Sequence, residues 1–167
     1  MISKLDDLKK VNFPECEQIP SEGIYKEELL MYIIKILEPL FVDDENFLTS
    51  SIVNNYVKLS YIDKPIKKRY YRESIAQLIV IIIFKQIITI EEISKGIEIE
   101  ISTFGVKEVY ENFVKIFHKV RDSIVEKPND NPIAIDFKVE DHHEKVLYYL
   151  SISLFSKLYT KIIIGNR

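Results

Sequence analysis

Basic and aromatic residues are interleaved between positions 56 and 72, and they are the part of the sequence with the clearest chemistry. From Lys58 to Arg72 there is one acid, Asp63, and the net charge is +5, from six basic residues: Lys58, Lys64, Lys67, Lys68, Arg69 and Arg72. Four tyrosines lie among them: Tyr56, Tyr61, Tyr70 and Tyr71. Lysine and arginine head groups and tyrosine hydroxyls are common contacts of a phosphate backbone. The stretch therefore predicts a nucleic-acid-binding surface, and the alternative is a solvated charged loop.

Histidine, cysteine and acidic residues elsewhere in the chain form no comparable pattern. His142 and His143 follow Asp141, but neighbouring residues on a helix point about 100° apart, so the two imidazoles cannot easily bind one ion. The single cysteine, Cys16, excludes an internal disulfide and a cysteine-based zinc site. It also has no basic or histidine neighbour that would activate its thiol. We therefore expect no metal, no cofactor and no enzymatic activity.

The composition of the 167-residue chain favours a helical protein with a real core, because 47% of its residues are apolar. Its 4 glycines argue against a sandwich or barrel with many tight turns, and they cannot supply either of the common phosphate-binding loops. The most apolar run, 75–90, contains Gln77, Lys85 and Gln86 and is too short and too polar to span a membrane. No signal peptide is visible, so we expect a cytoplasmic protein.

The formal net charge of −3 would by itself disfavour a nucleic-acid partner. The charge is unevenly distributed, however. Six acids and two lysines between Glu91 and Glu111 give that segment a net charge of −4. The acidic surplus therefore lies beyond the basic stretch, which keeps its own local positive charge.

The first half of the sequence predicts an irregular leader, two helices and a basic extended stretch. Pro14 and Pro20 bracket the leader, and Ser21 with Glu22 forms a plausible helix start. Apolar residues recur at helical spacing from 24 to 40, and Pro39 is expected to end or bend that helix. Thr49 is an N-cap for a short helix that runs to Lys58. Residues 67–72 then predict a short extended stretch.

The second half of the sequence predicts helices throughout. The run 73–87 is apolar on nearly every face; its β-branched residues also permit a strand, but its length and the lack of a partner strand favour a helix. Thr89 and Glu92 form a capping box for the next helix. Ser102 and Thr103 are expected to cap a helix with an apolar stripe over 106–124. After a loop at 127–132, residues 139–164 predict one long apolar helix.

Three short segments resemble the DNA-binding head of MerR-type regulators. Residues 52–62 (IVNNYVKLSYI) follow that family's short helix, 68–71 (KRYY) follow its wing, and 88–93 (ITIEEI) follow the end of its next helix. The segments 48–58, 67–70 and 84–86 look still more like the bacterial domain-of-unknown-function family 1836, itself presumed to be a MerR-like helix-turn-helix group. The resemblance covers about residues 20–100. Asn54 stands where the MerR pattern has an arginine, and the wing lacks its usual glycine.

The resemblance implies that residues 49–58 are a recognition helix in the major groove and that 64–72 are a basic wing on the phosphate backbone. It assigns DNA contacts to Ser50, Ser51, Asn54, Asn55, Tyr56, Lys58, Lys67, Lys68, Arg69 and Arg72. Asparagine amides can bond bidentately to adenine edges, and hydroxyls at a helix start can meet phosphate. The alternatives are local capping for the asparagines and packing against the wing for Tyr56. The cysteine ligands of metal-sensing members are absent, so no metal response is implied.

We therefore expect an all-α protein with a MerR-like winged helix-turn-helix head and a helical C-terminal region. The divisions are a leader over 1–20, a DNA-binding domain over 21–100 and a dimerisation or packing region over 101–167. The long last helix is either the centre of a monomeric bundle or half of a dimer interface, and we favour a homodimer. The predicted function is a transcriptional regulator that binds double-stranded DNA, with no membrane partner and no identified effector. The alternative is a helical protein-interaction module that does not bind DNA.

Overall fold

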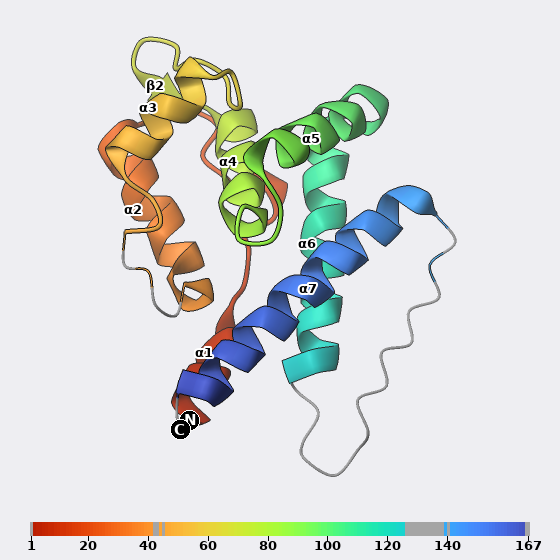
Figure 1. The fold of residues 1–167 in the computed structure, drawn as a ribbon. Coiled ribbons are helices and arrows are strands. Elements are labelled where there is room, and N and C mark those ends of the chain that lie inside the picture. Colours follow the sequence, from red (N-terminus) through yellow and green to blue (C-terminus); the bar gives the residue numbers. More distant parts are fainter. Residues whose placement is uncertain (1, 42–43, 45, 126–138, 140, 166–167) are drawn as a thin grey trace.

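The computed structural model describes residues 2–41, 44, 46–125, 139 and 141–165, and over these residues the protein is built from helices with one small sheet (Figure 1). In chain order the elements are α1 (Ile2–Lys10), the 3₁₀ turn η1 (Cys16–Gln18), β1 (Ile24–Tyr25), α2 (Lys26–Leu37), the 3₁₀ turn η2 (Glu38–Leu40), α3 (Ser50–Lys58), β2 (Arg69–Tyr70), α4 (Arg72–Phe84), α5 (Ile90–Phe104), α6 (Val106–Val125) and α7 (His142–Gly165). The predicted all-α class is confirmed. In the described part of the chain, no helix has the length and apolarity that crossing a membrane requires.

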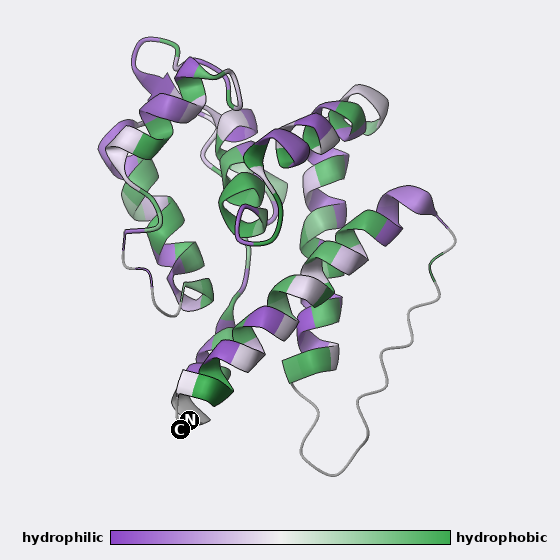
Figure 2. Cartoon of the chain, viewed as in Figure 1, coloured by the Kyte–Doolittle hydropathy of each residue, from purple (hydrophilic) through white to green (hydrophobic). Residues whose placement is uncertain are grey.

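Helix α4 lies at the centre of the molecule and is hydrophobic along almost its whole length (Figure 2). Every residue from Ser74 to Phe84 is buried except Gln77. A helix that is apolar on every side needs neighbours on every side, and α4 packs against α2, α5 and α6. This packing explains why the β-branched run forms a helix. As a strand of a two-stranded sheet, the run would be covered on only part of its apolar surface.

The other helices form two groups on either side of α4 (Figure 1). Helices α2 and α3 and the sheet lie on one side, and α5, α6 and α7 lie on the other. Within the second group α6 packs mainly along α7, with the rings of Phe117 and Phe155 4.8 Å apart. Helix α1 packs against both α6 and α7, so the two ends of the described chain lie close together.

Two of the predicted helix starts are confirmed by their capping hydrogen bonds. The hydroxyl of Thr49 accepts a hydrogen bond from the backbone N–H of Ile52 at 3.3 Å, which begins α3. Thr89 and Glu92 form the predicted capping box at the start of α5: the backbone N–H of Thr89 donates to the Glu92 carboxylate at 2.9 Å, and the Glu92 N–H donates to the Thr89 hydroxyl at 3.3 Å. Each cap satisfies a backbone donor that the helix itself leaves free.

The leader expected to be irregular over 1–20 begins instead with helix α1, and this prediction was wrong for residues 2–10. Leu8 and Val11 are fully buried, and the ring of Phe13 packs against those of Phe113 and Phe117 at 5.3 and 4.8 Å. The signal was the three-residue spacing of Leu5, Leu8 and Val11, which places apolar side chains on one helical face. Burial of that face on α6 stabilises a helix too short to persist alone.

Two further helix starts differ from the prediction. Ser102 and Thr103 do not cap α6: they lie in the last turn of α5, where both hydroxyls donate to the backbone carbonyl of Ile99, at 2.7 and 3.0 Å. Helix α5 thus continues past residue 100, and α6 begins after Gly105. Helix α2 begins at Lys26 rather than at Ser21–Glu22, because the preceding residues are drawn into strand β1. The predicted loop at 127–132 lies outside the described residues.

The backbone at Gly23, just before β1, predicts that alanine there lowers the stability of the protein, whereas alanine at Gly96 does not. Gly23 has a φ of +77°, and a Cβ there would lie 2.9 Å from Cζ of Tyr71 and 3.0 Å from Cβ of Arg69. Gly23→Ala should therefore lower the free energy of unfolding by about 1–3 kcal/mol in urea titrations. Gly96→Ala is the control: nothing lies within 4 Å of that position in α5, and alanine there should add about 0.5–1 kcal/mol. Equal stability of the parent and Gly23→Ala would contradict this account.

Candidate nucleic-acid interface

Helix α3 carries one continuous polar face. Ser51, Asn54, Asn55 and Lys58 are all exposed. Their spacing of three, four and seven residues places them on the same side of a helix. On the opposite side Val53 and Tyr56 are buried, which fixes the orientation of the helix. Ser50, the first residue of α3, is half-buried. The helix therefore presents two asparagine amides, a hydroxyl and an ammonium group outward together.

The basic extended stretch forms a hairpin with a two-residue turn. The N–H of Ile66 donates to the carbonyl of Arg69 at 3.0 Å, and the N–H of Arg69 donates back to Ile66 at the same distance. The turn residues, Lys67 and Lys68, have φ angles of 49° and 67°. Positive φ at both central positions is typical of a type I′ turn, which ordinarily carries Asn-Gly. The stretch thus turns back without a glycine, at the cost of two lysines in a disfavoured conformation.

Strand β2 of this hairpin pairs antiparallel with β1, in a register that sets Ile24 opposite Tyr70 and Tyr25 opposite Arg69. The guanidinium of Arg69 donates to the carbonyl of Gly23 at 2.8 Å and to the hydroxyl of Tyr25 at 3.4 Å. It also lies 4.4 Å from the centre of the Tyr25 ring, a cation–π distance. Arg69 therefore holds the two strands together.

Arg72, at the start of α4, is also bonded within the chain. Its guanidinium donates to the carbonyl of Ile19 at 3.1 Å and to that of Glu17 at 3.0 Å. Arg69 and Arg72 were both predicted to contact phosphate. In the structure each of them donates two hydrogen bonds within the chain, to partners in residues 17–25, so both guanidinium groups are held by the fold.

Tyr56 is buried, with 8% of its surface exposed, so packing rather than DNA contact accounts for it. Its ring meets the Tyr61 ring edge-on at 6.1 Å, and burial raises the pKa of its phenol. The hydroxyl of Tyr61 donates in turn to the carboxylate of Glu91 at 2.9 Å. Together these contacts tie the end of α3 to the start of α5.

Lys26 is a member of this surface that the sequence analysis missed. Its Nζ donates to Oδ1 of Asn54 at 3.2 Å, so the first residue of α2 adds a cation beside the polar face of α3. Its neighbour Tyr25 contacts Arg69 in the hairpin. Tyr25 and Lys26 therefore connect the α3 face to the hairpin. Lys26 was missed because it lies outside the basic run. It falls in the stretch 24–40, where only the helical spacing of the apolar residues was used.

Residues 14–113 match the family described as Domain of unknown function (DUF1836). The chain belongs to this family. No curated protein and no solved structure matches the chain. The DUF1836 match begins before β1 and ends inside α6, so it contains η1, the sheet and every residue of the surface described above. It also includes Glu17 and Ile19, whose carbonyls Arg72 binds.

Within the DUF1836 region four lysines are exposed around the hairpin and the end of α3: Lys58, Lys64, Lys67 and Lys68. None of the four has a hydrogen bond or ion pair from its side chain to another residue in the described part of the chain. Asn55 likewise makes no side-chain hydrogen bond there, whereas Asn54 is held by Lys26. These groups can therefore meet a partner without first breaking an internal contact.

The arginines and the lysines of the basic stretch are predicted to differ in their effect on stability. Arg72→Ala and Arg69→Ala each remove charge-assisted hydrogen bonds to backbone carbonyls, and should lower the free energy of unfolding by about 1–3 kcal/mol. Lys68→Ala is the control and should change it by less than about 0.5 kcal/mol. Urea unfolding of the three variants measures the difference. Arg72→Ala and Lys68→Ala of equal stability would contradict a holding role for Arg72.

Proposed function

We propose that this DUF1836 protein is a sequence-specific DNA-binding transcriptional regulator, with α3 in the major groove and the hairpin lysines on the phosphate backbone. The observation that carries the proposal is the exposed face of α3, formed by Ser51, Asn54, Asn55 and Lys58. A major groove admits an α-helix, and asparagine amides match the donor and acceptor pattern of adenine. The face carries two amides, and α3 packs on the core by its opposite side. Such a face suits base readout.

The order of elements supports a MerR-like winged helix-turn-helix. Helices α2 and α3 pack against each other, strand β2 follows α3 and pairs with β1 from before α2, and α4 and α5 complete the unit. In this interpretation α2 is the first helix of the motif, α3 the recognition helix and the Ile66–Arg69 hairpin the wing. The recognition helix would rest on the core through Val53 and Tyr56, as the motif requires of a helix that presents its other face to DNA.

The electrostatics of this surface support a phosphate partner despite the chain's net charge of −3. Lys58 belongs to the α3 face and Lys26 lies beside it, and Lys67 with Lys68 form the tip of the hairpin. Release of counterions from the phosphate backbone is driven by such local charge rather than by the net charge. Lys67 and Lys68 also have the positive φ angles that glycine or asparagine adopts more easily. Backbone strain of this kind is concentrated at functional sites.

We further propose that two copies of the chain associate through α7. This helix exposes large apolar side chains: Val146 is 58% exposed, Tyr149 70% and Ile164 65%. Exposed apolar side chains favour a partner surface. A second copy is the occupant that the DNA proposal requires, because a two-fold dimer presents two recognition helices to two half-sites.

The DNA proposal predicts which lysines determine the salt dependence of binding. DNA fragments are first selected from the whole source genome with the parent protein, and the affinity for a selected fragment is then measured by fluorescence anisotropy at several salt concentrations. Lys67→Ala with Lys68→Ala should weaken binding to all fragments and reduce the slope of log K against log salt by about 0.9 for each phosphate that the variant no longer neutralises. Asn55→Ala should instead relax the preference among sequences.

The matched control is Lys10→Ala with Lys35→Ala, which removes the same charge from the end of α1 and the last turn of α2, where both lysines line a hollow with Pro39 and neither belongs to α3 or the hairpin. This variant should keep the parent's affinity and salt slope. The absence of salt-sensitive binding to any fragment would reject the proposal. An equal loss of affinity in both double variants would reject the docking geometry. A stoichiometric protein partner captured by a chain that is inert toward DNA would favour the alternative, a protein-interaction module.

The dimer proposal predicts a change of mass in solution. Tyr149→Glu places a charge at an exposed position of α7 and should convert a dimer into a monomer, as measured by size-exclusion chromatography with light scattering. Met31→Glu is the control: Met31 is also an exposed apolar residue, at 66%, but lies on α2, and this variant should remain dimeric. A parent protein that is monomeric at micromolar concentration would contradict the proposal.

A further inference from the structure

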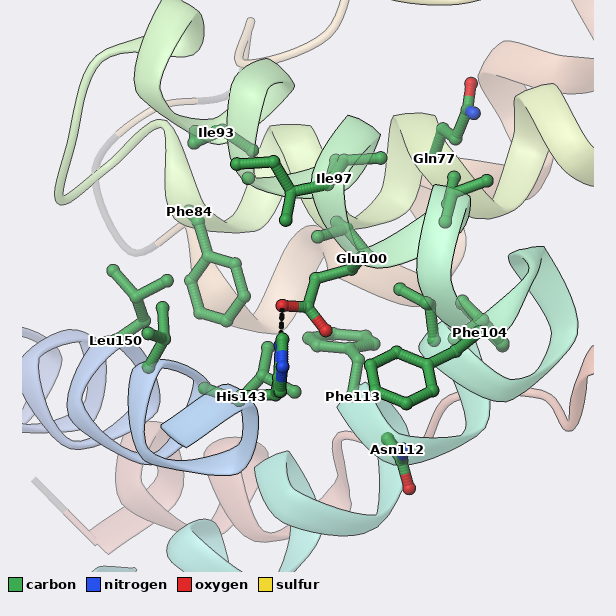
Figure 3. Close-up of a pocket in the computed structure, with 18 of the residues that line it drawn as sticks. Gln77, Phe84, Ile93, Ile97, Glu100, Phe104, Asn112, Phe113, His143 and Leu150 are labelled. Carbon is green, nitrogen blue, oxygen red and sulfur yellow. Dashed lines mark hydrogen bonds and ion pairs between the residues drawn. The ribbon is translucent and has the colours of Figure 1, made fainter. Parts of the chain in front are cut away.

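A cavity of about 520 Å³ lies between α4, α5, α6 and α7, and Figure 3 shows the side chains that surround it. Most of the lining is apolar, with at least one such residue from each of the four helices: Phe84 from α4, Ile93 and Ile97 from α5, Phe113 from α6, and Leu147 and Leu150 from α7. A volume of this size falls within the range of small-molecule sites, roughly 300–1,000 Å³. It belongs to a different part of the molecule from the α3 face and the hairpin.

The charged residues of this lining are strongly biased in sign. Five of them are acids: Glu92, Glu100, Glu108, Asp141 and Glu144. The lining residues in the described part of the chain include one imidazole, His143, and neither lysine nor arginine. An anionic ligand would therefore enter against five carboxylates, whereas a cation would be attracted by them.

Glu100 already bonds an imidazole at the edge of the cavity. Its Oε1 lies 2.6 Å from Nδ1 of His143, and Figure 3 shows the two side chains pointing toward each other from α5 and α7. The hydrogen bond and charge of Glu100 raise the pKa of His143 above its ordinary value. The ring of Phe104 meets the imidazole edge-on at 5.1 Å. The site is thus arranged around a carboxylate that has an imidazole neighbour and an aromatic ring close by.

We propose that this cavity binds an amphiphilic organic cation, with its apolar body among the four helices and its protonated amine beside Glu100. The amine would take the place that the His143 imidazole holds in the structure. Phe104 and Phe113 also line the cavity, and aromatic rings favour cations. A neutral ligand of the same shape would make the same apolar contacts but no ion pair with the Glu100 carboxylate.

This inference goes beyond the proposed function and does not depend on DNA binding. Its experiment measures ligand binding to the full chain without DNA. A failure of the cavity proposal can therefore be told apart from a failure of the DNA proposal. If both hold, the ligand lies against α4, the helix that begins three residues after Arg69 in the hairpin.

The experiment compares three probes that share one apolar body: phenylbutylamine, phenylbutanol and phenylbutyrate. Isothermal titration calorimetry of the parent chain should show the amine binding about tenfold or more tighter than the alcohol, and no binding of the acid. Glu100→Gln should bring the amine down to the affinity of the alcohol. Glu98→Gln, on the same helix but outside the lining, should leave the preference unchanged. Urea unfolding of both variants verifies that they remain folded.

His143 supplies a second test that does not remove the carboxylate. Because the imidazolium competes with the amine for Glu100, the affinity of the parent for phenylbutylamine should rise as the pH rises through the raised pKa of His143. The five acids of the lining face the same space, and Lys115 pairs with Glu144 at 3.6 Å; neither Glu144 nor Lys115 is altered in this test. His143→Gln should strengthen amine binding at low pH and flatten the pH dependence. Equal affinity for the three probes, or no binding of the amine at millimolar concentration, would overturn the proposal.

Discussion

The burial of α4 is the constraint on which the rest of the structure depends. Ten of its residues are buried, nearly all aliphatic, and a fully buried aliphatic side chain is stabilised by about 1.5–3 kcal/mol relative to an exposed one. No single neighbour can cover such a helix. Helix α2 covers it on one side and α5 with α6 on the other. The proposed DNA-binding surface and the cavity are thus placed by the same helix, one on each side of it.

Around this core, two arginines fix the position of the hairpin. Arg69 spans from β2 to the carbonyl of Gly23, and Arg72 spans from α4 to the carbonyls of Ile19 and Glu17. A sheet of two residues per strand has little stability of its own, so these charge-assisted bonds matter more here than in a larger sheet. They also leave Lys67 and Lys68 as the cations at the tip. In this protein a basic run divides into arginines that support the fold and lysines that face solvent.

The sequence predicted much of the fold, because local signals determine most of its helices. The cap at Thr49, the capping box at Thr89 and Glu92 and the periodic stripe of α6 all correspond to helices in the structure. Errors arose where long-range contacts decide the outcome. Helix α1 depends on burial against α6, and strand β1 depends on a partner more than forty residues away in sequence. The same holds for the site: the α3 face follows from helical spacing, whereas the partners of Arg69, Arg72 and Lys26 lie in distant segments.

The position of α4 between the two sites has a consequence for how they can influence each other. Val80 and Phe84 of α4 line the cavity, and the other end of the helix follows directly from the hairpin strand. Close-packed interiors respond to an added ligand by shifting rigid elements rather than by deforming continuously. A ligand that fills the space beside Phe84 would bear on α4 as a unit, and Arg72 in the first turn would carry any shift to η1 and to Ile19 just after it. An effector can alter DNA affinity only if it binds the DNA-binding arrangement of the chain and a second arrangement with different affinities. The change in DNA affinity is limited by that difference. The bonds of Arg69 and Arg72 are the contacts through which such a difference would reach the lysine turn.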